Sequence, residues 1–113
     1  MFGVSVKKVE RWSEKKKADK IIKALSHSSK EIRAAAAKGL GNIDSEEANN
    51  ALIISLKDPE PKVRLNAVIS LGKIGRANAI EHLRNVAKND GDTRVKEEAA
   101  HVLEQLREKL RVF

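Results

Sequence analysis

Hydrophobic residues along the chain recur with the three- and four-residue spacing of amphipathic helices. After Ile32, apolar side chains return at Ala35, Ala36, Leu40 and Ile43, which places them on one face of a helix. Comparable stripes occupy Val63, Ala67, Val68, Leu71 and Ile74, and later Val95, Ala99, Val102, Leu103, Leu106 and Leu110. The pattern, together with shorter stripes within residues 18–25, 48–56 and 79–87, predicts an all-α protein of about six helices.

The stripes also repeat at a nearly constant interval. An apolar–basic pair at Ile32-Arg33 returns at 63–64 after 31 residues (63 − 32) and at 95–96 after a further 32 (95 − 63). A period near thirty, with helical spacing inside each unit, is typical of a solenoid built from stacked helix pairs. We therefore expect an α-α superhelix.

Polar residues that can cap helices separate the stripes. Ser28 and Asp44 each stand three residues before a glutamate, which is the spacing of a capping box. Asp58 is expected to cap the next helix with Pro59 in its first position, and Asp92 or Thr93 to cap the last one. The expected helix boundaries lie near Ser28, Asp44, Asp58, Asn78 and Asp92.

These boundaries divide one domain, residues 1–113, into repeats. The expected units are a basic N-terminal cap over 1–17, a half-repeat over 18–27, full repeats over 28–57 and 58–88, and a half-repeat with a long terminal helix over 89–113.

The long terminal helix carries an apolar stripe, and the sequence predicts no following helix to cover it. Its members are Val95, Val102, Leu106 and Leu110. Repeat arrays need polar ends, and the many charged residues of this helix are expected to shield the stripe. We therefore expect a monomer.

Charge is distributed unevenly along the chain. The formal net charge is +7, and residues 1–23 contain eight Lys or Arg and three acidic residues, a net +5 (8 − 3). This basic region includes the run Lys15, Lys16 and Lys17. It is interpreted either as a solvated helical end or as an electrostatic patch for nucleic acid or an acidic protein. The solvated end is favoured, because neither an arginine cluster nor interleaved aromatic residues accompany the lysines.

Composition excludes several kinds of chemistry. The sequence has no cysteine, which excludes disulfides, zinc–thiolate sites and thiol catalysis and is compatible with a reducing compartment. No apolar run reaches membrane-spanning length, and the first residues do not resemble a secretory signal. We expect a cytoplasmic protein without membrane contact, catalytic residues, metal or cofactor.

The second full repeat carries a recognisable motif. Lys57-Asp-Pro-Glu-Pro-Lys-Val-Arg64, followed by Ala67 and by Leu71-Gly-Lys-Ile-Gly75, resembles a HEAT repeat, most of all the short subtype of phycobilisome-lyase HEAT-like proteins. The resemblance covers roughly residues 18–106 in three copies. It implies an α-α superhelix with first helices on the convex side and second helices on the concave side. It also implies a scaffold that binds other macromolecules.

A basic residue recurs at one position of this motif, as Arg33, Arg64 and Lys96. The resemblance implies that this residue bridges to an acid or carbonyl of a neighbouring turn, and Asp58 is the expected acid for Arg64. We interpret all three as structural, because a binding site seldom recurs in every unit.

Enzymes with HEAT-like repeats leave traces that can be sought in this chain. HEAT-like hydroxylases carry repeated His-Glu pairs, whereas His27, His82 and His101 precede Ser, Leu and Val. The three histidines are interpreted as surface or turn residues rather than metal ligands. Bilin lyases of this type are considerably longer, so their activity is not carried over. HEAT-like DNA glycosylases read DNA through a basic concave face, which keeps nucleic acid as the second hypothesis.

The concave face expected for the second helices is the candidate partner-binding surface. On it, Ile54 would be an apolar residue among polar ones. Single exposed apolar residues are ordinary, but Ile54 could also anchor a helix or peptide. The residues expected to project from this face are Asp19, Lys20, Lys23, Asn50, Ile54, Glu81, Asn85 and Lys88.

The leading hypothesis is a non-enzymatic scaffold or adaptor that binds another protein. The alternative is a module that binds nucleic acid or an acidic partner through its basic N-terminal and concave surfaces. An accessory subunit of a lyase-type enzyme is the least favoured hypothesis.

Overall fold

The computed structural model describes residues 3–111, which form helices and no strand. The helices are α1 (Val6–Glu14), α2 (Ala18–Ala24), α3 (Lys30–Leu40), α4 (Glu46–Ser55), α5 (Pro61–Ile74), α6 (Ile80–Asn89) and α7 (Thr93–Leu110), with a 3-10 turn, η1 (Ala77–Ala79), before α6. The all-α class is confirmed, with seven α-helices in this part of the chain where about six were expected. Residues 1–2 and 112–113 of the expected domain lie outside the described residues.

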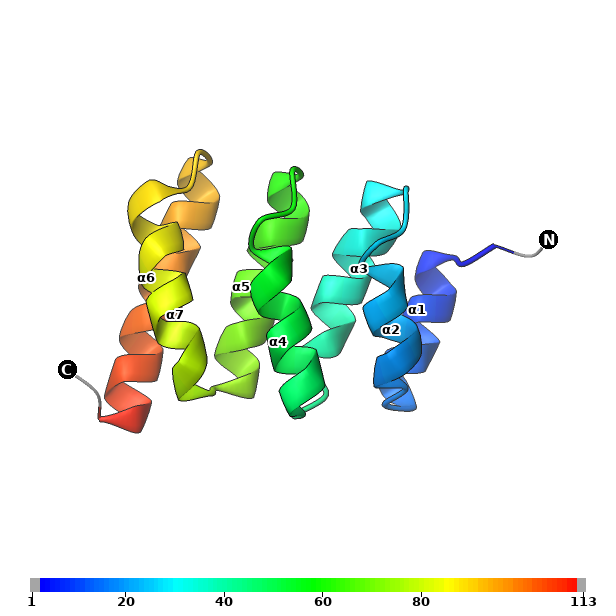
Figure 1. Ribbon diagram of the computed structural model, residues 1–113, viewed down its shortest axis with the longest axis horizontal. Helices are drawn as coiled ribbons and strands as arrows, with labels where there is room; N and C mark the ends of the chain where they lie inside the picture. The colour runs from blue at the N-terminus through cyan, green and yellow to red at the C-terminus, as the bar shows by residue number, and fades with distance from the viewer. Residues whose placement is uncertain (1–2, 112–113) are drawn as a thin grey trace.

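The helices form two layers (Figure 1). α1, α3, α5 and α7 lie side by side in one layer, and α2, α4 and α6 cover one side of it. Successive helices alternate in direction, and the described residues extend over 49 × 27 × 16 Å. This is an α-helical solenoid. We call the outer surface of α1, α3, α5 and α7 the first-helix face, and that of α2, α4 and α6 the second-helix face.

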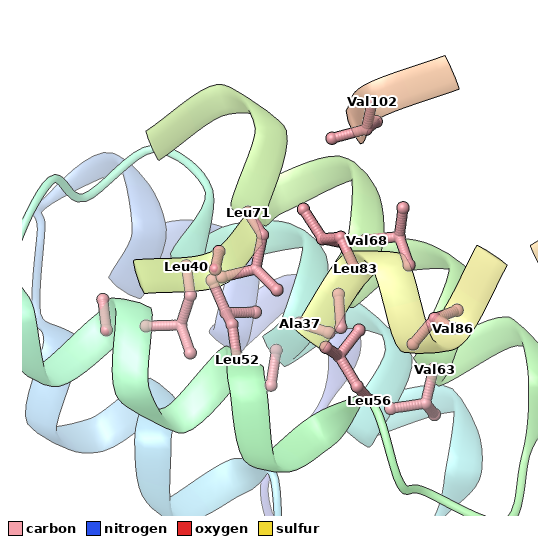
Figure 2. Close-up of a cluster of buried hydrophobic side chains, with 14 of the residues drawn as sticks. Ala37, Leu40, Leu52, Leu56, Val63, Val68, Leu71, Leu83, Val86 and Val102 are labelled. Atoms are coloured by element: carbon pink, nitrogen blue, oxygen red, sulfur yellow. The ribbon is translucent and has the colours of Figure 1, made fainter. Parts of the chain in front are cut away.

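The core lies between the layers and consists of aliphatic side chains. Leu52, Leu71 and Leu83 are completely buried. Figure 2 shows Leu71 of α5 beside Leu40 of α3 and Leu52 of α4. Burying such a side chain stabilises the fold by about 1.5–3 kcal/mol, so contacts between units hold the array together.

Small residues let the first helices approach closely. The Oγ of Ser70 on α5 donates a hydrogen bond of 2.6 Å to the carbonyl O of Ala37 on α3. A β-carbon on Gly41 would lie only 2.6 Å from the Oγ of Ser70, and one on Gly72 would lie 2.8 Å from Cγ1 of Val102 on α7. Gly72 is therefore a helix-packing residue inside α5 rather than part of the following turn.

The helix caps lie close to their expected positions. Ser29 rather than Ser28 caps α3, by accepting a hydrogen bond from the N–H three residues later. Ser45 rather than Asp44 caps α4 in the same way, and Asp92 caps α7 as predicted. The boundary residues are thus right to within one position at these helices.

The start of α5 differs in detail from the prediction. Its N-cap is Glu60 and its first residue is Pro61, not Pro59. Asp58 does not cap the helix, because its Oδ1 accepts the backbone N–H of Glu60 at 2.9 Å within the preceding turn.

Two arginines join consecutive repeats along one edge of the array. The guanidinium of Arg33 donates to both carboxylate oxygens of Asp58 at 2.9 and 3.2 Å, and Arg64 donates likewise to Asp90 at 2.9 and 3.1 Å. The expected pairing of Arg64 with the Asp58 carboxylate is therefore wrong. That carboxylate faces the preceding repeat, and Arg64 instead donates to the backbone O of Asp58 at 2.8 Å. Lys96 forms no ion pair within residues 3–111.

The apolar stripe of α7 is covered. Val95, Val102 and Leu106 are at most 3% exposed, and Leu110 is half-buried. The expectation of an uncovered stripe is wrong, because the stripe faces inward onto α5 and α6, which α7 contacts along its length.

Candidate protein-binding site

A groove opens on the second-helix face between α2 and α4. It has a volume of about 370 Å³. Ile22 and Leu25 of α2, with Ala51 and Ile54 of α4, form its apolar walls. Its polar end is formed by Ser26, Ser55, Lys57 and Asp58. The groove therefore lies along the C-terminal halves of both helices.

The groove exists because second helices pack less closely than first helices. α3, α5 and α7 meet through glycine, alanine and serine, whereas α2 and α4 make few direct contacts. α2 is also only seven residues long. Ile22 and Leu25 are consequently only half-buried and are accessible from the groove.

Ile54 stands at this groove with most of its side chain in solvent. It is 74% exposed, the highest value among the large apolar residues within 3–111. Of the eight residues predicted to bind a partner, Ile54 is the one that lines the groove.

The other predicted residues share the second-helix face but do not surround one hollow. All eight are exposed: Asp19, Lys20 and Lys23 on α2, Asn50 and Ile54 on α4, and Glu81, Asn85 and Lys88 on α6. On α6, Glu81 forms an ion pair with Arg84, and the Oδ1 of Asn85 accepts from Nδ2 of Asn89 at 2.7 Å. The polar groups of α6 are thus partly engaged within their own helix.

The predicted basic patch lies in the turn between α1 and α2. Lys16 has a left-handed φ of 54°, and its Nζ donates to the backbone O of Asn42 at 2.8 Å. Lys16 therefore ties this turn to the end of α3, and all three lysines, Lys15, Lys16 and Lys17, are exposed. The turn precedes the N-terminus of α2, so the lysine run and the α2–α4 groove lie at opposite edges of the array (Figure 1).

One aromatic residue does accompany the N-terminal lysines, contrary to the sequence prediction. The Nζ atoms of Lys8 and Lys20 lie 5.9 and 5.7 Å from the centre of the Trp12 ring. At these distances the ring interacts with the chain's own cations. Trp12 is half-buried, so it stabilises the N-terminal end more than it offers a stacking platform.

Sequence reasoning missed most of the groove walls. Ile22 occupies the same repeat position as Ile53, so the repeat predicts a core residue there. Leu25, Ala51 and Lys57 carry no separate signal. Their exposure depends on the spacing between helices, which no local pattern of residues encodes.

The charges at the polar end of the groove do not cancel completely. The hydrogen bond with Asp58 raises the pKa of Arg33 above its ordinary value, against the opposing effect of burial, so these two groups form a tight pair. Lys57 lines the same end and is exposed, without an ion-pair partner in the described part of the chain. A carboxylate of a ligand would complement it.

Residues 3–111 contain neither a membrane-spanning helix nor a cluster of metal-ligating side chains. No helix has an apolar stretch long enough to cross a membrane. In the same residues, no three His, Cys, Asp or Glu side chains come together as a potential metal site.

Comparison with known proteins identifies the family. HEAT repeats match residues 18–104, and the chain belongs to the HEAT repeat family. A curated relative is the bilin biosynthesis protein MpeU of Synechococcus sp. (strain WH8020), which is 36% identical over 77 residues. The match covers 67% of this chain and 26% of MpeU, so the chain spans about a quarter of that relative's length.

A solved structure shows the same fold. It is the crystal structure of an engineered protein from the Northeast Structural Genomics Consortium, with a TM-score of 0.63 and 21% sequence identity. The superposition covers 92% of this chain and 51% of the engineered one. At this identity the likeness concerns the fold alone.

Proposed function

We propose that the protein is a non-enzymatic interaction module that binds another protein through the α2–α4 groove. Membership of the HEAT repeat family supports a scaffold. The observation that carries the location is Ile54, which is 74% exposed at a groove with apolar walls. A partner side chain that covers Ile54 and reaches Ile22 would remove apolar surface from water on both sides.

The positive charge near the groove indicates that the partner is acidic. Lys57 lines the groove, and Lys23 projects from the neighbouring helix. The chain as a whole carries a net +7. An acidic helix or peptide is therefore steered toward this face, and Ile54 then anchors it.

Affinity capture with a point variant tests this function. The intact chain and Ile54→Asp would each be used to capture proteins from a lysate of the source organism, with Ala100→Asp on α7 as an exposed control outside the second-helix face. We expect a partner that is retained by the parent chain and the control but lost from Ile54→Asp. The same set of proteins on all three baits would refute the groove as the binding site.

A charge variant separates steering from anchoring once that partner is purified. Lys20→Glu/Lys23→Glu should slow association and reduce its salt dependence, whereas Ile54→Asp should speed dissociation. Equal rate constants for both variants and the parent chain would contradict the assignment of these roles.

A second candidate function is that of an accessory subunit of an enzyme that acts on bilins, and the similarity to MpeU favours it. Titration of the purified chain with a free bilin tests it, with the absorbance spectrum as the readout. A spectral change that saturates at one bilin per chain would support this function. A spectrum identical to that of the bilin in buffer would leave protein binding as the function of the module.

A further inference from the structure

The first-helix face carries a second, unassigned surface. Three adjoining hollows of about 300, 240 and 280 Å³ lie over α1, α3 and α5. Lys62 lines all three, and Lys38 and Asn66 line both the first and the last. The shared residues show that the hollows form one trough.

The trough follows α3, which has small side chains where its neighbours have larger ones. Its floor contains Ala34, Ala35 and Gly39. Val6 of α1 stands on one side and Ile69 of α5 on the other. They are 38% and 40% exposed, and with Ile54 they make up the exposed large apolar residues of the described chain. An apolar ligand surface would therefore meet apolar groups on the floor and on both walls.

Charge along the trough is asymmetric. The hollow between α3 and α5 is lined by Lys38, Lys62 and Lys73 around Ile69, with no acidic residue. None of these three lysines forms an ion pair within residues 3–111. On the α1 side the wall includes Glu10 instead. The middle hollow, at the start of α5, has mixed charge, because Glu31 and Glu60 line it with Lys30 and Lys62. The α5 wall is therefore basic around Ile69, and the α1 wall is not.

We propose that this trough binds an amphipathic helix of a partner protein, with the acidic flank of that helix against α5. A floor of alanine and glycine lets a helix backbone approach closely. The flanking helices α1 and α5 run alongside α3, so a bound helix could lie between them (Figure 1). α3 has 11 residues, a length of about 16 Å at 1.5 Å per residue, which corresponds to about three turns of the bound helix.

The same observations disfavour nucleic acid in this trough. A nucleic acid backbone requires continuous positive charge, but Glu10 on α1, Glu31 on α3 and Glu60 at the start of α5 interrupt it. The exposed apolar side chains of Val6 and Ile69 would also gain nothing from contact with phosphate groups. A protein helix complements both features.

This surface is independent of the α2–α4 groove proposed above. The trough is formed by α1, α3 and α5 on the opposite layer, and it shares no lining residue with the groove. A module with both sites could bridge two proteins, which is what an adaptor must do.

A peptide selection tests the proposal. The bait is the intact chain carrying Ile54→Asp, which removes the anchor of the other groove. The probe is a displayed library of helical peptides about three turns long. We expect enriched peptides with apolar residues at i, i+4 and i+7 and with Asp or Glu on one flank. Failure to enrich any binder, or binders without acidic residues, would overturn the proposal.

Matched variants then locate the site by fluorescence anisotropy of one enriched peptide. Lys38→Glu/Lys62→Glu and Ile69→Asp should each weaken binding by about tenfold or more, whereas Lys20→Glu/Lys23→Glu on the other face should change it less than about twofold. Circular dichroism verifies that each variant folds. Unchanged affinity in Ile69→Asp, or displacement of the peptide by mixed-sequence duplex DNA, would overturn the proposal while leaving the α2–α4 groove untouched.

Discussion

At the scale of single residues, the absence of one atom determines how closely two repeats pack. Gly72 has space for hydrogen but not for a β-carbon, which would lie 2.8 Å from Cγ1 of Val102. Protein interiors are close-packed, so a clash of this size must be relieved by moving a whole helix or by an unfavourable rotamer. Glycine residues at helix contacts therefore contribute to stability because they leave room for side chains of the neighbouring helix.

Gly72→Ala should lower the free energy of unfolding by about 1–3 kcal/mol, because the added methyl forces α5 and α7 apart. Urea denaturation followed by circular dichroism measures it. Gly91→Ala is the control, since a β-carbon there meets nothing within 4 Å. The double variant Gly72→Ala/Val102→Ala should recover part of the lost unfolding free energy. If the two substitutions instead lower it additively, the added methyl does not clash with Val102.

Leu71→Ala should cost about 2–5 kcal/mol, because the completely buried side chain leaves a cavity between α3, α4 and α5. Ile54→Ala is the matched control, since it also shortens an aliphatic side chain but one that is 74% exposed. We expect the control to change thermal stability by less than about 0.5 kcal/mol. Equal effects of the two variants would show that Leu71 is not in the core.

Asn49 shows a polar residue at an otherwise apolar repeat position. It is completely buried, and its Nδ2 donates to Oδ1 of the exposed Asn78 at 2.7 Å. Asn78→Ala removes almost no packing but leaves a buried donor unpaired, so we expect a loss of about 1–3 kcal/mol in unfolding free energy. Asn78→Asp retains an acceptor and should lose less; similar losses in calorimetry for both variants would contradict the role of this bond.

At the scale of elements, one turn is built three times with different residues. The backbone N–H groups of Ser29, Glu60 and Asp92 each donate, at 2.9 Å, to the side chain two residues before. The acceptors are His27, Asp58 and Asp90. Where the acceptor is an aspartate, its carboxylate also forms an ion pair with the arginine of the preceding repeat. A turn that closes locally thereby also joins two units.

Arg64→Ala should lower the free energy of unfolding by about 2–3 kcal/mol, because it removes hydrogen bonds from a carboxylate that is only 6% exposed. Lys96→Ala is the matched control at the same repeat position, without an ion pair in the described residues. Its effect should stay below about 0.5 kcal/mol. If chemical denaturation shows equal losses, the arginine acts through its aliphatic stem and not through Asp90.

The helices were predictable from the sequence, whereas the contacts between repeats were not. The apolar stripe from Ile32 to Leu40 encodes a helix locally, and capping residues mark its start to within one position, whereas Ile43, predicted on the same face, lies beyond the end of α3. The pairing of Arg33 with Asp58 spans 25 residues and depends on which way the turn faces. Asp58 was predicted to cap a helix because an aspartate before a proline is typical of a helix start. In the structure it accepts a hydrogen bond within its own turn and pairs with Arg33 of the preceding repeat, and the sequence does not distinguish these roles from capping.

At the scale of the whole molecule, the candidate site follows from spacing between helices. The repeat placed Ile54 on an exposed surface, and the structure agrees. Neither the α2–α4 groove nor the trough over α3 could be predicted. The groove depends on the loose packing of the short α2 against α4, and the trough depends on which larger side chains of α1 and α5 flank the small ones of α3. Both arise from tertiary packing, which periodicity does not encode.

The covered stripe of α7 determines what a second copy of the chain could bind at this end of the array. Val95, Val102 and Leu106 are buried against α5 and α6, and the outward side of α7 carries exposed polar residues, namely Glu97, His101, Glu104, Gln105 and Glu108. A polar end of this kind gives a second copy little apolar surface to bury, so we expect the 113-residue chain to be a monomer. Light scattering after size exclusion should give one chain per particle.

Leu110→Glu serves as the control in this measurement, because Leu110 is the half-buried residue at the end of the stripe. The variant should have the same mass as the parent chain, since no interface depends on that side chain. A dimer that this substitution dissociates would show that the end of α7 is covered by a second copy. In that case the polar outward side of α7 would not be sufficient to cap the array.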